Sequence, residues 1–192
     1  MINHEHKFIF IHVSKTGGTS IEHALNPNVS LDHSDNSNTT GNTAFKDKHW
    51  SALKYKRECP KEYESYFKFA FVRNPWDRLV SNYKWLVYIG KEQLDFKDWI
   101  INPTWGFNAY LYSRMLCDNN GNKMVDFIGK FENLQEDFNT VCEKIGIPCQ
   151  QLPHKNKTDH KHYTEYYNNE TRQLVGERYA QDIERFGYTF GE

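Results

Sequence analysis

The sequence predicts an α/β fold built around a parallel sheet. Three short apolar runs read as strands, at residues 7–13 (KFIFIHV), 67–72 (FKFAFV) and, more weakly, 124–129 (MVDFIG). The first two are nearly continuous in apolar side chains, which is typical of strands covered on both faces. Helical patterns alternate with the strands, and this alternation favours parallel pairing. Between the first two strands, the polar stretch 26–46 predicts a long mobile surface loop.

Three longer patterns predict helices, at residues 74–87, 133–146 and 170–187. Asn74 suits an N-cap and Pro75 the first helical position, so the first helix has a strong start signal. Asn133 and Glu136 have the spacing of a capping box at the start of the second helix, and Gly146 ends it. The third pattern predicts one continuous helix that ends in a glycine.

Composition limits the function classes. The chain has 192 residues, and we expect a single domain over 1–192. With 24 basic and 25 acidic residues the formal net charge is −1, so no global attraction to nucleic acid or a membrane surface is implied. No run approaches the roughly 18 apolar residues of a membrane span, and the N-terminus reads as a strand. The four cysteines lack metal-site spacing; we expect reduced, mostly buried thiols, a cytoplasmic location and no bound metal.

The loop after the first strand has the composition of an anion-binding site. Gly17 and Gly18 permit a tight turn that aims backbone N–H groups at an anion, and the following helix adds a partial positive charge. The other donors of this loop are Lys15, Thr16, Thr19 and Ser20. In nucleoside-triphosphate loops the lysine follows the last glycine, whereas here it comes first. We therefore expect a ligand of lower charge than a triphosphate; an ordinary glycine turn with a surface lysine is the alternative.

A second strand–loop–helix unit, residues 69–83, repeats this arrangement. Arg73 stands at the end of the strand, and Ser81 follows about two helical turns later. Arginine is the side chain best suited to a bidentate grip on phosphate. Asp77 and Arg78 are expected to pair locally and brace the site. The alternative is that Arg73 only pairs with a carboxylate.

Together these segments resemble the PAPS-dependent sulfotransferases, and more closely their Golgi-type carbohydrate branch, which is sulfotransferase family 2-like. FIHVSKTGGTSI is similar to that family's 5′-phosphosulfate loop and FVRNPWDRLVSNY to its 3′-phosphate motif; residues 126–147 and 152–188 look like its downstream segments. One departure is Ser14, where the family often has proline. The resemblance implies a P-loop-NTPase-like fold of three layers, with a central parallel sheet flanked by helices.

The resemblance also implies a sulfate donor, 3′-phosphoadenosine 5′-phosphosulfate (PAPS). Residues 15–20 would hold its 5′-phosphosulfate, and Arg73 and Ser81 its 3′-phosphate. The implied activity is that of a sulfotransferase of class EC 2.8.2, which moves the sulfuryl group in line to a hydroxyl of a carbohydrate acceptor. A sulfuryl group is less charged than a terminal phosphoryl group, which agrees with the early lysine, and no metal is required.

Such a transfer needs a base for the acceptor proton and stabilisation of charge on the leaving phosphate. Histidine suits the first task because its pKa lies near working pH. His49 is similar to the family's base, since Ala52 follows it by three residues, and residues 47–59 read as a helix that begins near it. Lys15 is expected on the leaving-group side. A solvated histidine at a helix end is the alternative for His49.

Further contacts follow from the resemblance. Residues 153–163 look like a segment that covers the nucleotide, with Lys157 and Tyr163 as contacts. Trp105 is a weak assignment to the acceptor sugar, because packing is the default for aromatic side chains. His12 is expected to be a packed, hydrogen-bonded histidine rather than the base.

Two other functions remain open from the residues. A small P-loop kinase would need ATP and Mg²⁺, and the early lysine and the lack of a clear acidic strand end count against it. A non-catalytic module would bind a nucleotide or a sulfated glycan without turnover. The acceptor's identity is not encoded in any motif, and carbohydrate is favoured by the resemblance alone.

Overall fold

The computed structural model describes residues 1–26, 49–102, 111–153 and 161–192. The described strands form one sheet in the order β1 (Ile2–Asn3), β2 (Phe8–Ile11), β3 (Phe67–Val72) and β4 (Phe127–Lys130). β2, β3 and β4 are parallel, as predicted, and β1 adds a short antiparallel edge strand. The third strand begins later than predicted because the Met124 N–H bonds instead to the Leu116 carbonyl at 2.8 Å.

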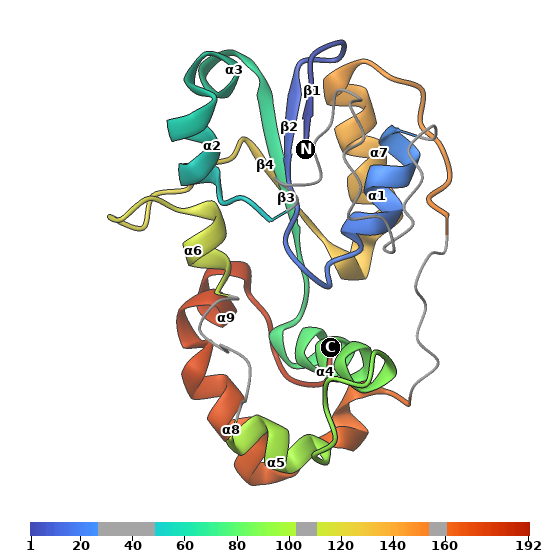
Figure 1. Ribbon diagram of the computed structural model, residues 1–192, viewed down its shortest axis with the longest axis vertical. Helices are drawn as coiled ribbons and strands as arrows, with labels where there is room; N and C mark the ends of the chain where they lie inside the picture. The colour runs from blue at the N-terminus through green and yellow to red at the C-terminus, as the bar shows by residue number, and fades with distance from the viewer. Residues whose placement is uncertain (27–48, 103–110, 154–160) are drawn as a thin grey trace.

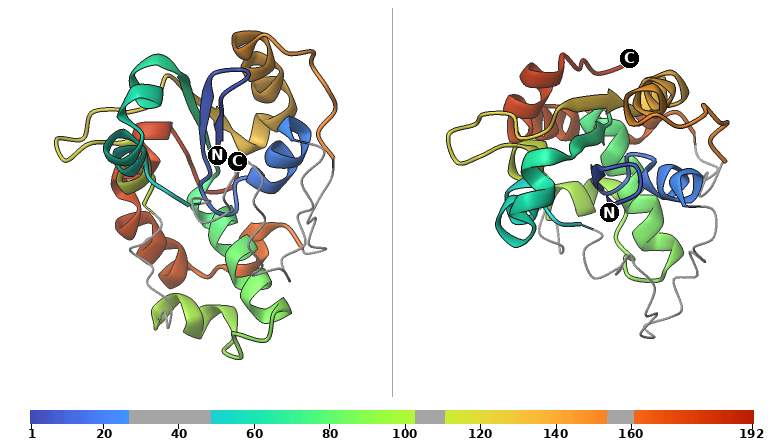
Figure 2. Two further views of the ribbon diagram at one scale, coloured as in Figure 1. Left: turned by 45° about the horizontal axis from the view of Figure 1, so that its top comes forward. Right: turned by 90° about the horizontal axis from the view of Figure 1, so that it is seen from above.

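Helices cover both faces of the sheet (Figure 1). One face carries α1 (Gly18–Leu25) and α7 (Leu134–Ile145), and the other carries α2 (Ala52–Glu58), α3 (Pro60–Ser65) and α6 (Tyr112–Leu116). A further group lies beyond the carboxyl ends of the strands: α4 (Pro75–Tyr88), α5 (Phe96–Ile101), α8 (Asn169–Arg178) and α9 (Ala180–Phe186). Two short 3₁₀ turns, η3 (Phe131–Asn133) and η4 (Tyr163–Tyr166), complete the described elements. Figure 2 shows the same layers from two more directions.

The strand sequences explain the layering. Successive side chains of a strand point to opposite faces, and Phe8 and Phe10 of β2 pack in the cluster that contains α1 and α7. Ile9 and Ile11 pack in the cluster that contains α2 and α6. All four side chains are fully buried, as expected for a strand covered on both sides. The predicted α/β fold with helices on both faces of a central sheet is confirmed.

Several predicted helix ends are confirmed. The Asn74 side chain accepts a hydrogen bond from the Trp76 N–H at 3.1 Å, and Pro75 is the first helical residue of α4. This cap matters for the site because it fixes the direction in which the chain leaves β3. Gly146 and Gly187 end α7 and α9 in the left-handed conformation, with φ of 70° and 64°.

The capping box predicted from Asn133 and Glu136 is wrong. α7 does begin after Asn133, but the Asn133 side chain caps no backbone N–H. The chain enters this helix through η3, so Asn133 already belongs to a turn and lacks the extended conformation of an N-cap. A side chain of the first turn bonds backwards instead, because Asp137 Oδ2 accepts the Lys130 N–H at 2.6 Å.

The single helix predicted over 170–187 is also wrong. α8 ends at Arg178 and α9 begins at Ala180, while Tyr179 between them has φ −109° and ψ 17°. The Tyr179 ring is buried in the cluster that contains Trp76 of α4. Burial of this large ring against α4 favours the break over continuation of the helix.

Candidate functional site

The loop between β2 and α1 lies at the carboxyl end of β2 (Figure 1). Two of its residues have positive φ, Lys15 at 65° and Gly17 at 81°. Gly17 meets a second constraint, because a Cβ there would lie 2.9 Å from Leu134 Cδ2. α1 starts at Gly18, and the first N–H groups of a helix have no partner within it, although here the Ser20 N–H bonds to the Gly17 carbonyl. The loop therefore offers backbone donors and the positive end of a helix dipole to an anion.

The three hydroxyl residues predicted to bind the anion, in this loop and the first turn of α1, have different surroundings. Thr16 is fully buried, and its hydroxyl donates to the Val13 carbonyl at 2.8 Å. This bond fixes the turn, so the Thr16 side chain acts on the loop itself. Ser20 is also buried and lies in the first turn of α1, where its N–H bonds to the Gly17 carbonyl at 3.0 Å. Thr19 is the most accessible of the three.

His12 lies directly beneath the loop. Its Nδ1 is 2.7 Å from Glu22 Oε1, and both side chains are buried. A Cβ on Gly18 would overlap the His12 imidazole, so only glycine leaves room for the ring. The Phe10 ring stacks on the other side, with centroids 5.6 Å apart. The expectation of a packed, hydrogen-bonded His12 is confirmed.

His49 lies beside His12, just before α2. The expected helix begins at Ala52 rather than at residue 47, because the Ser51 side chain caps it by accepting the Lys54 N–H at 3.2 Å. His49 Nδ1 is 3.1 Å from the His12 carbonyl oxygen, and the two imidazoles meet edge to face at 5.0 Å. A carbonyl can only accept, so His49 Nδ1 carries the hydrogen in this contact. In the neutral ring Nε2 then holds the lone pair, which is the state that a general base requires.

Arg73 connects the two predicted anion sites. It is 7% exposed, at the end of β3. Its Nη1 donates to the Lys15 carbonyl at 3.2 Å and its Nε to Asp77 Oδ2 at 2.8 Å. The guanidinium carbon lies 3.9 Å from the centre of the Phe131 ring. The end of the second strand is thereby fixed against the loop that follows the first.

The predicted local pair of Asp77 with Arg78 is wrong. Adjacent residues on a helix point in different directions, and Asp77 pairs instead with Arg73, which precedes the Asn74 cap. Arg78 crosses to the first loop instead, where its Nε donates to the Ser14 carbonyl at 3.0 Å. Its guanidinium also lies over the Tyr112 ring, 4.4 Å from the centre. Two arginines of the second unit thus hold the first loop.

Tyr112 fixes the backbone of Arg73. Its hydroxyl accepts the Arg73 N–H at 2.9 Å and donates to the Arg73 carbonyl at 2.6 Å, and Tyr112 is fully buried. Asp182, also fully buried, accepts the N–H groups of Tyr112 at 2.7 Å and Ser113 at 3.1 Å. Sequence reasoning missed both roles. A carboxylate among the apolar residues of the final helical pattern was the one available signal for Asp182.

One face of α4 lies along the loop. Arg78, Ser81 and Trp85 share this face because they are spaced by three or four residues. Ser81 is buried, and Lys15 Nζ lies 5.1 Å from the centre of the Trp85 ring. A narrow recess separates the loop from α4, lined by Ser14, Lys15, Pro75, Arg78, Leu79, Asn82 and Tyr179.

In this arrangement the two predicted anion sites, at the ends of β2 and β3, contact each other. A model of the "Sulfotransferase family" matches residues 1–189. The chain belongs to the sulfotransferase family. A crystal structure of a sulfotransferase from Alicyclobacillus acidocaldarius superposes with a TM-score of 0.55 at 17% identity and covers 93% of each chain. At that identity the likeness shows the P-loop-like fold alone.

One curated relative also matches this sulfotransferase-family chain. It is an uncharacterized protein of Archaeoglobus fulgidus, 36% identical over 90 residues, which are 46% of this chain and 74% of that protein. Family and fold together support sulfuryl transfer as the class of activity. Among the described residues, no helix is long and apolar enough to cross a membrane. Across the same ranges, no group of three or more His, Cys, Asp or Glu residues could hold a metal ion.

The remaining predicted contacts have different outcomes. Tyr163 is buried, and its hydroxyl accepts N–H groups from Gly191 at 2.6 Å and from Asn74 Nδ2 at 3.3 Å. It therefore lies beside the residue that follows Arg73. Lys157 and Trp105 lie outside the described residues, as does the predicted mobile loop from residue 27 onward. Of the four cysteines, Cys117 and Cys142 are buried, Cys59 is half-buried and Cys149 is exposed, and all are free thiols.

The charge of Lys15 predicts a pH dependence. Burial, followed by the nearby positive charge of Arg73, lowers the pKa of Lys15 to about 8. Its charge is therefore complete at lower pH and is lost as pH rises through 8. Because an anionic ligand needs the charged form, affinity for adenosine 3′,5′-bisphosphate should fall roughly tenfold between pH 7 and pH 9. Phosphate ionisation is complete over most of this range and does not compensate.

Isothermal titration calorimetry at three pH values measures this effect. Lys15→Met should bind more weakly at pH 7 and lose most of the pH dependence. An affinity of the wild type that is constant from pH 7 to pH 9 would show that Lys15 does not face the ligand's charge.

Proposed function

We propose that this protein transfers the sulfuryl group of PAPS to a hydroxyl of a carbohydrate acceptor. The observation that carries the proposal is the contact between the two anion sites, where Arg73 Nη1 meets the Lys15 carbonyl at 3.2 Å. One nucleotide with anionic groups at both its 3′ and 5′ positions fits two cationic sites joined in this way. A nucleoside triphosphate carries all of its phosphates at the 5′ position and would leave the second cationic site empty.

Each residue has a separate task in this proposal. The backbone donors of residues 15–20 bind the 5′-phosphosulfate, and Lys15 stabilises the charge that develops on the leaving phosphate. Arg73 and Ser81 bind the 3′-phosphate. His49 Nε2 takes the proton of the acceptor hydroxyl as its oxygen attacks sulfur in line. The bond from sulfur to the bridging oxygen breaks, and the products are a sulfate ester and adenosine 3′,5′-bisphosphate.

Three further contacts belong to the proposal. Lys157 and Tyr163 would cover the bound nucleotide, and Trp105 would contact the acceptor sugar. The protonated state of Lys15 also belongs here, because a neutral amine would leave the departing phosphate with less stabilisation. Carbohydrate remains the proposed acceptor class from the likeness of the two anion-site motifs to the carbohydrate sulfotransferases.

Thermal unfolding tests the donor. Adenosine 3′,5′-bisphosphate at a hundred times its Kd stabilises a protein by about 2.7 kcal/mol. For a domain of this size this corresponds to a rise in Tm of roughly 5–10 °C. We expect this rise without magnesium, and a much smaller rise with ATP. A larger effect of ATP with Mg²⁺ would instead support a small kinase, and release of the bisphosphate from PAPS in the presence of an acceptor would demonstrate transfer.

A further inference from the structure

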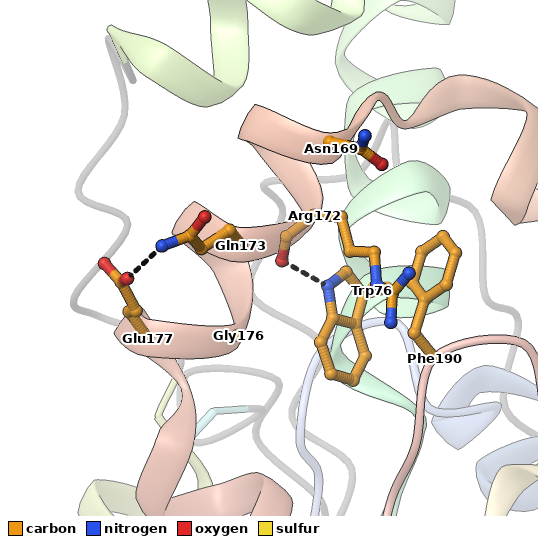
Figure 3. A pocket seen from close by; sticks show the side chains of 7 residues that line it. All are labelled: Trp76, Asn169, Arg172, Gln173, Gly176, Glu177 and Phe190. Carbon is orange, nitrogen blue, oxygen red and sulfur yellow. Dashed lines mark hydrogen bonds between the residues drawn. The ribbon is translucent and has the colours of Figure 1, made fainter.

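A second hollow lies away from the two anion sites, between α8, the first turn of α4 and the C-terminal segment (Figure 3). Its volume is about 500 Å³, and it is largely open to solvent. The lining residues are Trp76, Asn169, Arg172, Gln173, Gly176, Glu177 and Phe190. Five of them occupy one face of α8, at a spacing of three or four residues.

Aromatic rings form one end of this hollow. Trp76 is fixed because its Nε1–H donates to the Arg172 carbonyl at 3.0 Å. Phe190 meets the Trp76 ring edge to face, with centroids 5.6 Å apart, and it makes similar contacts with Tyr163 and Tyr167. The ring positions are therefore set by their neighbours before any ligand arrives, which lowers the ordering cost of binding.

Arg172 supplies a charge at the same end. Its guanidinium carbon lies 4.9 Å from the centre of the Phe190 ring, and Figure 3 shows the group next to Trp76. In the described part of the chain, no carboxylate lies within ion-pair distance of Arg172, and its guanidinium donates no hydrogen bond there. Glu177, at the other end of the hollow, accepts from Gln173 Nε2 at 2.9 Å instead. The Arg172 guanidinium therefore lies beside aromatic rings, and its N–H groups can donate hydrogen bonds to a ligand.

Gly176 lines the hollow from the last turn of α8. Glycine is among the poorest residues for a helix interior. Here packing does not require it, because a Cβ would meet only Trp76 Cζ2, at an ordinary contact distance of 3.5 Å. The absence of a side chain has one visible effect, which is to keep the floor of the hollow open.

The C-terminal segment separates this hollow from the 3′-phosphate site. Asn74 Nδ2 donates to the Thr189 carbonyl at 2.8 Å, and the Gly191 N–H donates to the Tyr163 hydroxyl at 2.6 Å. These bonds place residues 189–191 against the start of α4, next to Arg73. The hollow lies next to the proposed nucleotide site, and its lining includes none of the residues assigned to that site.

We propose that this hollow binds an acidic sugar residue, one that carries a carboxylate or a sulfate ester. An arginine fork matches the paired oxygens of either group. The aromatic rings suit the apolar face of a pyranose, and the amides of Asn169 and Gln173 suit its hydroxyls. The proposal rests on the proposed function, because it makes the hollow a second binding site for an acidic acceptor chain or for its sulfated product.

Calorimetry without any sulfate donor tests this site directly. The probe is a chondroitin sulfate tetrasaccharide, with neutral cellotetraose for comparison. We expect the acidic tetrasaccharide to bind at least tenfold more tightly than the neutral one. Arg172→Gln should weaken its binding at least tenfold, and Gly176→Leu should do the same by filling the hollow. Arg57→Gln, an equal loss of charge on an exposed arginine of α2, should leave it within twofold.

Titration of each variant with adenosine 3′,5′-bisphosphate separates the two proposals. Both α8 variants should keep wild-type affinity for this nucleotide, and their Tm should confirm that they fold. If both variants keep wild-type affinity for the tetrasaccharide, or if the wild type does not bind it, the proposed acidic-sugar site is overturned. The donor proposal would stay intact. Competition between the tetrasaccharide and the bisphosphate would also overturn it, because the hollow would then belong to the nucleotide site.

Discussion

His49→Gln should lower the rate of sulfuryl transfer by at least a hundredfold while donor affinity stays within twofold of wild type. General-base catalysis contributes typically 10²- to 10⁴-fold, and the glutamine amide cannot accept the proton. Donor affinity should survive because the substitution keeps a donor for the bond that His49 Nδ1 makes to the His12 carbonyl. A glutamine amide can still donate there, so the loop keeps its support.

Single-turnover kinetics with PAPS and calorimetry with adenosine 3′,5′-bisphosphate measure the two quantities. His4→Gln is the matched control, since His4 contacts Tyr66 at an exposed position in the hairpin that contains β1. Retention of more than a tenth of the rate in His49→Gln would remove His49 from the mechanism. If no transfer occurs with wild type although the bisphosphate binds, the protein is a binding module.

Arg73→Lys should weaken adenosine 3′,5′-bisphosphate binding at least tenfold, with adenosine 5′-monophosphate affected less than threefold. Lysine keeps the positive charge beside Asp77, so this half-buried carboxylate is not left unpaired. It loses the fork that can grip a phosphate with two parallel bonds. A larger loss of affinity for the bisphosphate than for the monophosphate would be due to the 3′-phosphate, because a general loss of stability at the site would weaken the binding of both nucleotides.

Tyr112→Phe extends this test to a residue that touches no ligand. It removes the hydroxyl that bonds both the N–H and the carbonyl of Arg73, so we expect a smaller loss with the same preference for the bisphosphate. Tyr63→Phe is the control, because Tyr63 is buried in the same cluster but its hydroxyl donates to Met124, away from the anion sites. Equal losses for both nucleotides in Arg73→Lys would show that Arg73 supports the fold and does not read the 3′-phosphate.

Much of the fold and of the two predicted anion sites could be predicted from the sequence, because the motifs that specify them are local. Gly17, the Asn74 cap and the buried strands act within a few residues, so short motifs specify them. Asp77 was assigned the wrong partner for a physical reason, because adjacent residues on a helix point in different directions and Arg73, at the end of β3, lies within reach of the first turn of α4. The break at Tyr179 depends on packing against α4, which no window of sequence contains.

The support behind the site was the least predictable part. Tyr112 reaches Arg73 across 39 positions, and Asp182 reaches Tyr112 across 70. His12 and Gly18 lie close in the chain, yet their mutual fit appears only when the ring is placed beneath the turn. Sequence motifs therefore specified the groups that are proposed to face a ligand, whereas the residues that hold these groups became visible only in three dimensions.

The bond from the Arg73 guanidinium to the Lys15 carbonyl has a geometric consequence. In the proposed function, residues 15–20 and Arg73 bind opposite ends of the donor, so this bond sets the separation of the two charges that the protein would accept. An isomer with its extra phosphate moved by one carbon of the ribose, such as adenosine 2′,5′-bisphosphate, presents the same total charge at the wrong separation and should be discriminated against on distance alone.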